Sequence, residues 1–176
     1  MKKNFFIFTI LSTILLISCS TENIETDVQG NLLTENIERG LDSYTNLIAG
    51  QNTDSGNVVI TEIDGNLDVT YETEGDWVIL ETHLYVGSQE DMPATRPGNP
   101  KIGRFPYKTD HGDGVTTFTY SDLYELAINE CTWVVAHAVV YNTVTHQEET
   151  AWANGEQVNG NNWAMWFEVC YEGGPS

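Results

Sequence analysis

The chain has 176 residues, 40% of them hydrophobic, and a formal net charge of −19 from 7 Lys and Arg against 26 Asp and Glu. This length suits one domain with a substantial hydrophobic core. So acidic a surface excludes nucleic acid as a partner, since its binding requires cations that neutralise phosphates, and argues against adsorption to anionic lipid.

The first 18 residues have the pattern of an export signal: two lysines, an apolar run from Phe5 to Ile17, and a serine. The run has 13 residues, whereas a membrane-spanning helix needs about 20. Residues 16–19, Leu-Ile-Ser-Cys, resemble the bacterial lipobox, in which the signal is cut before a lipidated cysteine. This resemblance implies a diacylglyceryl group on Cys19. An ordinary signal peptide with a chance cysteine is the alternative.

Lipidation would hold the mature protein at a membrane surface, because two or more buried acyl chains anchor stably. Ser20 follows the cysteine, in place of the aspartate that retains some bacterial lipoproteins in the inner membrane. We therefore expect the outer membrane, on its periplasmic or cell-surface side. Residues 19–44 are polar and acidic and are predicted to be a flexible tether. Residues 45–176 are predicted to be the folded domain.

Hydrophobic residues alternate with polar ones from about residue 56 onward, which predicts β-strands. Residues 58–60 and 67–71 flank Asp64-Gly65-Asn66, a hairpin signal. Residues 77–86 form a long strand. One face of that strand is apolar and is expected to point into the core: Val78, Leu80, Thr82, Leu84 and Val86.

Residues 87–114 break the alternation. They hold four of the five prolines and four of the five cations that remain after removal of the signal. Long loops inside a compact domain are usually functional, disordered, or hide an unrecognised element. Residues 104–108 are a candidate edge strand, where proline is tolerated.

Alternation resumes at 115–120, and residues 121–126 are predicted to form one or two helical turns capped by Ser121. Residues 132–143 are apolar on both faces and are expected to form a central strand, and 163–171 a final strand. We predict an all-β fold: a single antiparallel β-sandwich (Ig-like or jelly-roll-like) of about eight strands, with a β-barrel as the alternative.

Cys131 and Cys170 remain once Cys19 is lipidated. An even pair in an oxidising compartment predicts a disulfide between them. Two buried thiols on strands are the alternative.

Several phrases resemble a group of secreted and cell-surface bacterial β-domains without an assigned biochemical role. They are residues 81–87 (ETHLYVG), 98–107 (GNPKIGRFPY), 136–140 (AHAVV), 149–153 (ETAWA) and 162–167 (NWAMWF). The resemblance spans roughly residues 46–172. It implies an extracellular β-domain and brings no catalytic residues.

Two sets of residues are candidate metal ligands. His83 and His137 lie on long strands and could act with a carboxylate as a metal or general-base site, although histidines on strands are more often bonded within the structure. Asp110 and Asp113 lie in an Asp/Gly-rich stretch that could hold calcium. Most such stretches are simply turns, and no other cofactor is expected.

A third set combines aromatic rings with the cations of the long loop and could contact a ligand: Trp77, Tyr85, Arg96, Lys101, Arg104, Tyr107 and Trp152. We therefore expect a non-catalytic surface lipoprotein that binds a glycan or a surface protein through the loop. The alternatives are a hydrolase that uses a metal or a His/carboxylate pair, and a purely structural envelope protein.

Overall fold

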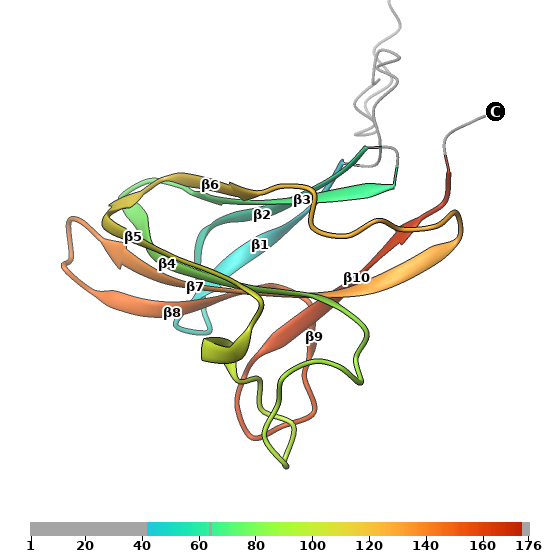
Figure 1. Ribbon diagram of the computed structural model, residues 1–176. Coiled ribbons are helices and arrows are strands. Elements are labelled where there is room, and N and C mark those ends of the chain that lie inside the picture. Colours follow the sequence, from blue (N-terminus) through green and yellow to red (C-terminus); the bar gives the residue numbers. More distant parts are fainter. Residues whose placement is uncertain (1–41, 64, 174–176) are drawn as a thin grey trace, which may run out of the picture. The chain divides into compact units, whose positions relative to one another are not determined.

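The computed structural model describes residues 42–63 and 65–173 of the chain (Figure 1). The predicted signal, Cys19 and nearly all of the predicted tether lie outside these residues. Within them, no helix is long and apolar enough to cross a membrane. The elements are β1 (Asp42–Ala49), β2 (Thr53–Ile63), β3 (Asn66–Thr73), β4 (Trp77–Gly87), the 3-10 turn η1 (Ile102–Arg104), β5 (Tyr107–Val115), β6 (Thr117–Tyr120), β7 (Glu130–Asn142), β8 (Glu148–Ala153), β9 (Glu156–Gln157) and β10 (Met165–Tyr171).

Eight strands form one antiparallel sheet in the order β5-β4-β7-β8-β1-β2-β3-β6, and this sheet curls nearly into a barrel (Figure 1). Side chains connect its two ends, because the Tyr120 hydroxyl of β6 lies 3.0 Å from Oγ1 of Thr109 on β5. The prediction of an all-β, antiparallel fold of about eight strands is confirmed. The β-barrel, given above as the alternative, is the shape that this single curled sheet approaches.

The main core fills the inside of the curled sheet, where side chains point inward at every second position. β4 departs from the predicted alternation because a bulge lies between Ile79 and Glu81. Beyond the bulge, Thr82 and Leu84 are buried as predicted. Before it, Ile79 is the buried residue, while Val78 and Leu80 are only half-buried. One extra residue moves the remaining side chains to the opposite face.

A second cluster covers the outer face of the sheet. Met92 and Phe105 come from the long loop, and Val158 and Ala164 come from the connection between β8 and β10. They pack on side chains of β4, β7 and β8 that point outward, among them Val135. β7 is thus covered on both faces, as predicted. The long loop ends in β5, an edge strand that begins at Tyr107 within the range expected for one.

The predicted helical turns at 121–126 are wrong. The backbone there is not helical, and it pairs with the start of β3: Leu67 donates to the carbonyl of Tyr124 at 3.0 Å, and Leu123 donates to that of Leu67 at 3.0 Å. Leu123 and Leu126 enter the main core. Asp122 has a φ of 53°, which is incompatible with a right-handed turn. Burial of two leucines therefore outweighs the capping signal of Ser121.

The predicted disulfide is present. Cys131 of β7 and Cys170 of β10 are directly opposite in the ladder, with Cα atoms 4.0 Å apart, and their sulfurs are bonded. The bridge fastens β10 to the central strand.

Candidate binding pocket

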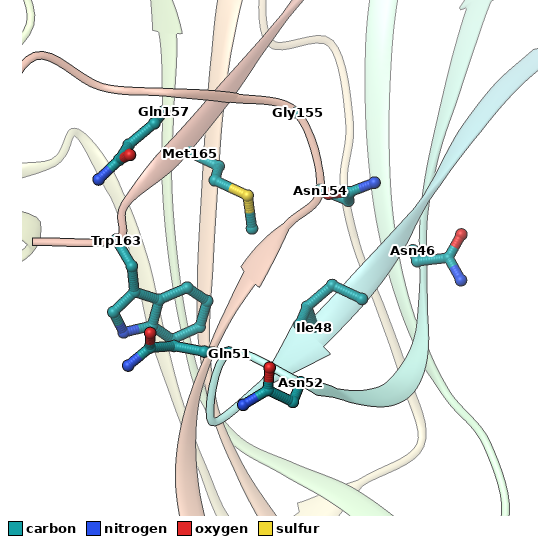
Figure 2. A pocket seen from close by; sticks show the side chains of 9 residues that line it. All are labelled: Asn46, Ile48, Gln51, Asn52, Asn154, Gly155, Gln157, Trp163 and Met165. Atoms are coloured by element: carbon teal, nitrogen blue, oxygen red, sulfur yellow. The ribbon is translucent and has the colours of Figure 1, made fainter.

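A pocket opens where the sheet divides. β8 and β10 lie along the same edge of β7, β8 against residues 137–141 and β10 against residues 130–134. Between these two ladders the strands separate, and β8 leads into the segment that carries β9. The space between β1 and the β9–β10 pair is the pocket (Figure 2).

The pocket has a volume of about 500 Å³, within the range of about 300–1,000 Å³ typical of small-molecule sites. Five of its nine lining residues carry side-chain amides and none is ionisable. The lining residues are Asn46, Ile48, Gln51, Asn52, Asn154, Gly155, Gln157, Trp163 and Met165.

Strand alternation on β1 supplies one wall. Leu47 and Ala49 are fully buried in the main core, so Asn46 and Ile48 point to the opposite, outer face and reach the pocket. The β1–β2 turn supplies the rim: Gln51 adopts the left-handed conformation with a φ of 75°. Both Gln51 and its neighbour in the turn are exposed.

Trp163 supplies the other wall. Its ring meets that of Trp152 edge-on, with centroids 6.4 Å apart and an interplanar angle of 82°. The segment is also held by hydrogen bonds: the Gln157 amide donates to the Asn162 carbonyl at 2.8 Å, and the Val158 backbone donates to that of Ala164 at 2.8 Å. Figure 2 shows the amides of the pocket arranged around the Trp163 ring and the Met165 side chain. The aromatic wall is therefore preorganised.

The loop between β4 and η1 packs against the segment that carries Trp163. Asn161 donates its backbone N–H to the side-chain oxygen of Asn99 at 2.6 Å. Gly98, with a φ of 98°, packs so closely that an added Cβ would lie 1.5 Å from the Asn159 carbonyl oxygen. The loop tip and the segment that carries Trp163 therefore form one unit.

The predicted histidines come together elsewhere, as directly opposite residues of β4 and β7. Their Nδ1 atoms are 3.3 Å apart, and Nε2 of His83 lies 3.8 Å from the Glu81 carboxylate. His137 is only 1% exposed and its ring meets the edge of Trp152. Burial, and then the neighbouring His83, lower the pKa of His137 to about 3. Burial also lowers the pKa of His83, although Glu81 opposes this shift.

The predicted calcium ligands are not gathered into a ligand set in the described residues. Asp110 and Asp113 are exposed on β5, and the Asp110 carboxylate accepts from the backbone of Gly112 at 2.9 Å, which is a local turn. In residues 42–63 and 65–173, the one group of three metal-ligating side chains within 4.8 Å of one another is Cys131, Glu168 and Cys170. Its two sulfurs are bonded to each other.

The seven residues predicted to contact a ligand are dispersed, and none lines the pocket. Tyr85 and Trp152 are buried in the second cluster, and Trp77 packs at the edge of the main core. The Tyr107 hydroxyl donates to the Leu123 carbonyl at 3.0 Å. The three cations lie in the connection between β4 and β5. Arg96 is in its first part, Lys101 directly precedes η1, and Arg104 ends η1.

Sequence reasoning missed the pocket residues because they lie in turns and at strand ends, far apart in the chain. The one available signal was the density of Asn and Gln in residues 51–52 and 154–162, next to Trp163. Comparisons of the chain with protein-family models, curated proteins and solved structures find no match.

Proposed function

We propose that the domain is a non-catalytic module that binds a neutral glycan at this pocket, on an exported protein held to the membrane by lipid on Cys19. One observation carries the proposal: a concave site with five amide side chains, an aromatic wall at Trp163 and no ionisable residue. A side-chain amide has both donors and acceptors. Sugar hydroxyls need both, and the apolar face of a sugar ring stacks on an indole. Two of the five amides donate within the protein, Asn46 to Asp54 and Gln157 to the Asn162 carbonyl, and keep their remaining groups for a ligand.

The charge of the chain favours a neutral ligand over an acidic one. The net charge is −19 and no cation lines the pocket, so a uronic or sialic acid would meet repulsion without a compensating ion pair. A neutral sugar avoids this cost.

Binding is favoured over hydrolysis by the position of the titratable groups. Glycoside hydrolysis normally uses two carboxyl groups that flank the scissile bond, and no Asp or Glu lines the pocket. Neither histidine that could serve a hydrolase lines the pocket, and His137 packs against Trp152 of the second cluster with 1% exposure. A substrate in the pocket would not touch them.

A glycan array probed with the full chain, purified in detergent, tests the proposal. We expect binding to neutral oligosaccharides and not to their uronic acid counterparts. Trp163→Ala should weaken binding about 30-fold or more, because truncation of a central aromatic in a binding site typically costs about 2 kcal/mol or more.

Asn52→Ala is the second variant, because Asn52 is an exposed rim residue whose truncation does not disturb the core. It should weaken binding severalfold, since one net hydrogen bond contributes about 1 kcal/mol. Circular dichroism and thermal unfolding check that both variants remain folded. Wild-type protein that binds no neutral glycan would refute the proposal and leave a protein partner or a structural envelope role.

A further inference from the structure

The outer face of β1 carries a large aromatic ring beyond the pocket. Tyr44 is 76% exposed, the largest exposed fraction among the described residues with large hydrophobic side chains, followed by Ile128 and Val144 at 64%. A single exposed ring is common on protein surfaces, so its place relative to the pocket decides whether it can contact the same ligand.

Tyr44 lies on the same face of β1 as the pocket residues Asn46 and Ile48. Leu47 and Ala49 point the other way and are fully buried. The β1–β2 ladder has an irregularity, but Asn46 pairs with Asn57 and Ile48 with Asp54, so the extra residue belongs to β2. The alternation of β1 is therefore uninterrupted. Tyr44 lies about 7 Å along the strand from Asn46.

Among residues 42–63 and 65–173, no strand pairs with Tyr44 on the edge of β1 that faces β8. β8 pairs only with Leu47, Ile48 and Ala49, and beyond them the chain of β8 turns away after Asn154, whose N–H donates to the Asn46 carbonyl at 2.7 Å. Opposite Tyr44 on β2 lies Val59, which is half-buried and uncharged. Asp54, which pairs with Ile48, is exposed on this stretch and accepts from the Asn46 amide at 2.5 Å. The surface from the pocket to Tyr44 therefore combines uncharged groups with one carboxylate, which can accept from sugar hydroxyls and would repel an acidic ligand.

We propose that the pocket and Tyr44 form one extended site for a neutral oligosaccharide, with one end in the pocket against Trp163 and a later ring stacked on Tyr44. This inference rests on the proposed function and adds that the ligand is a chain of several sugars. On this proposal a short ligand bound against Trp163 does not reach Tyr44, so the phenol contributes only to longer ligands.

Calorimetric titration of the full chain with paired lengths tests the inference. The probes are the disaccharides and hexasaccharides of α-1,4-glucan, β-1,4-glucan, β-1,4-xylan and β-1,4-mannan. For a series that binds, wild-type protein should bind the hexasaccharide about tenfold more tightly than the disaccharide, the gain from one stacked aromatic ring.

Tyr44→Ala should abolish this gain and leave disaccharide affinity within about twofold, while Tyr44→Phe keeps the gain because the ring remains. Val144→Ala, at another exposed apolar position, on the β7–β8 turn, is the control and should change neither.

The outcomes separate the two proposals. If Tyr44→Ala weakens neither length while Trp163→Ala weakens both, the extended site is wrong and the pocket stands. If Tyr44→Ala weakens both lengths equally, Tyr44 is not a distal subsite and the inference is also overturned. If no neutral sugar of either length binds wild-type protein, both proposals fail.

Discussion

Two regions of the same outer sheet face carry polar side chains beside aromatic rings, and they differ in what covers them. One cross-strand row joins them: Lys108, His83, His137, Trp152 and Ile48. At His137 the face is covered and the ring is 1% exposed, and the His83 side chain beside it is 12% exposed. At Ile48 the face is open, and the exposed polar groups are amides.

The difference teaches that residue type alone does not identify a group that a ligand can reach. By residue type, the histidine pair is the stronger catalytic candidate, yet its burial lowers the pKa of both rings and keeps them neutral near pH 7. The amides cannot transfer protons, but they face a cavity. The exposed site is therefore suited to recognition.

Removal of the disulfide should give the largest effect, because it loosens β10, which carries Met165 into the open region. The loop between Cys131 and Cys170 spans 39 residues, for which the chain-entropy relation gives about 4 kcal/mol. We expect Cys131→Ser/Cys170→Ser to lose about 2–4 kcal/mol in chemical denaturation under non-reducing conditions. Unchanged stability, or free thiols in the wild-type protein, would contradict the bridge.

Gly98→Ala should give the second-largest loss of stability, because it disrupts the packing of the loop between β4 and η1 against the segment that carries Trp163. The added Cβ would meet the Asn159 carbonyl oxygen at 1.5 Å, and φ is 98°. Strain and overpacking together predict a loss of about 3 kcal/mol and weaker glycan binding. Gly103→Ala is the control: nothing lies within 4 Å of its added Cβ. Equal melting temperatures for the two variants would refute this packing.

Acid should destabilise the folded protein, because His137 is buried in its neutral form. Its folded pKa of about 3 is below the unfolded value of 6.5, so only the unfolded chain takes up the proton as the pH falls from 6.5 toward 3. Stability is therefore complete above pH 6.5 and is lost below it, by about 2.5 kcal/mol at pH 4.5.

Many carboxylates also titrate in this range, so the informative quantity is the difference in slope between wild type and His137→Gln. Urea denaturation at pH 7.0 and 4.5 measures it. The variant should lose about 2.5 kcal/mol less than wild type between these two pH values. Parallel curves would mean that His137 is solvated in the folded protein.

The sequence was informative wherever alternation, turn residues or cysteine count decided the structure. The hairpin of β2 and β3, the two-sided burial of β7 and the disulfide follow from such local patterns. The bulge in β4 could not be predicted, because it is set by pairing with β5 and β7. The helical prediction at 121–126 failed because burial of Leu123 and Leu126 depends on tertiary contacts.

The pocket could not be predicted from the sequence for a related reason. It is formed where β8 and β10 diverge along one edge of β7, and such a division has no signature in any single segment. Asn46 and Trp163 are far apart in the chain, and each reads as an ordinary strand or turn residue by itself. The histidines were easier to single out, since their residue type draws attention whether or not a ligand can reach them.

NMR titration of isotope-labelled protein with the neutral oligosaccharide that binds best on the array tests most directly whether the pocket holds the ligand. We expect shifts of the side-chain amide signals of Gln51, Asn52 and Gln157 and of the Trp163 indole, with the imidazole signals of His83 and His137 unchanged. Shifts at the imidazoles without shifts at the pocket amides would contradict this expectation.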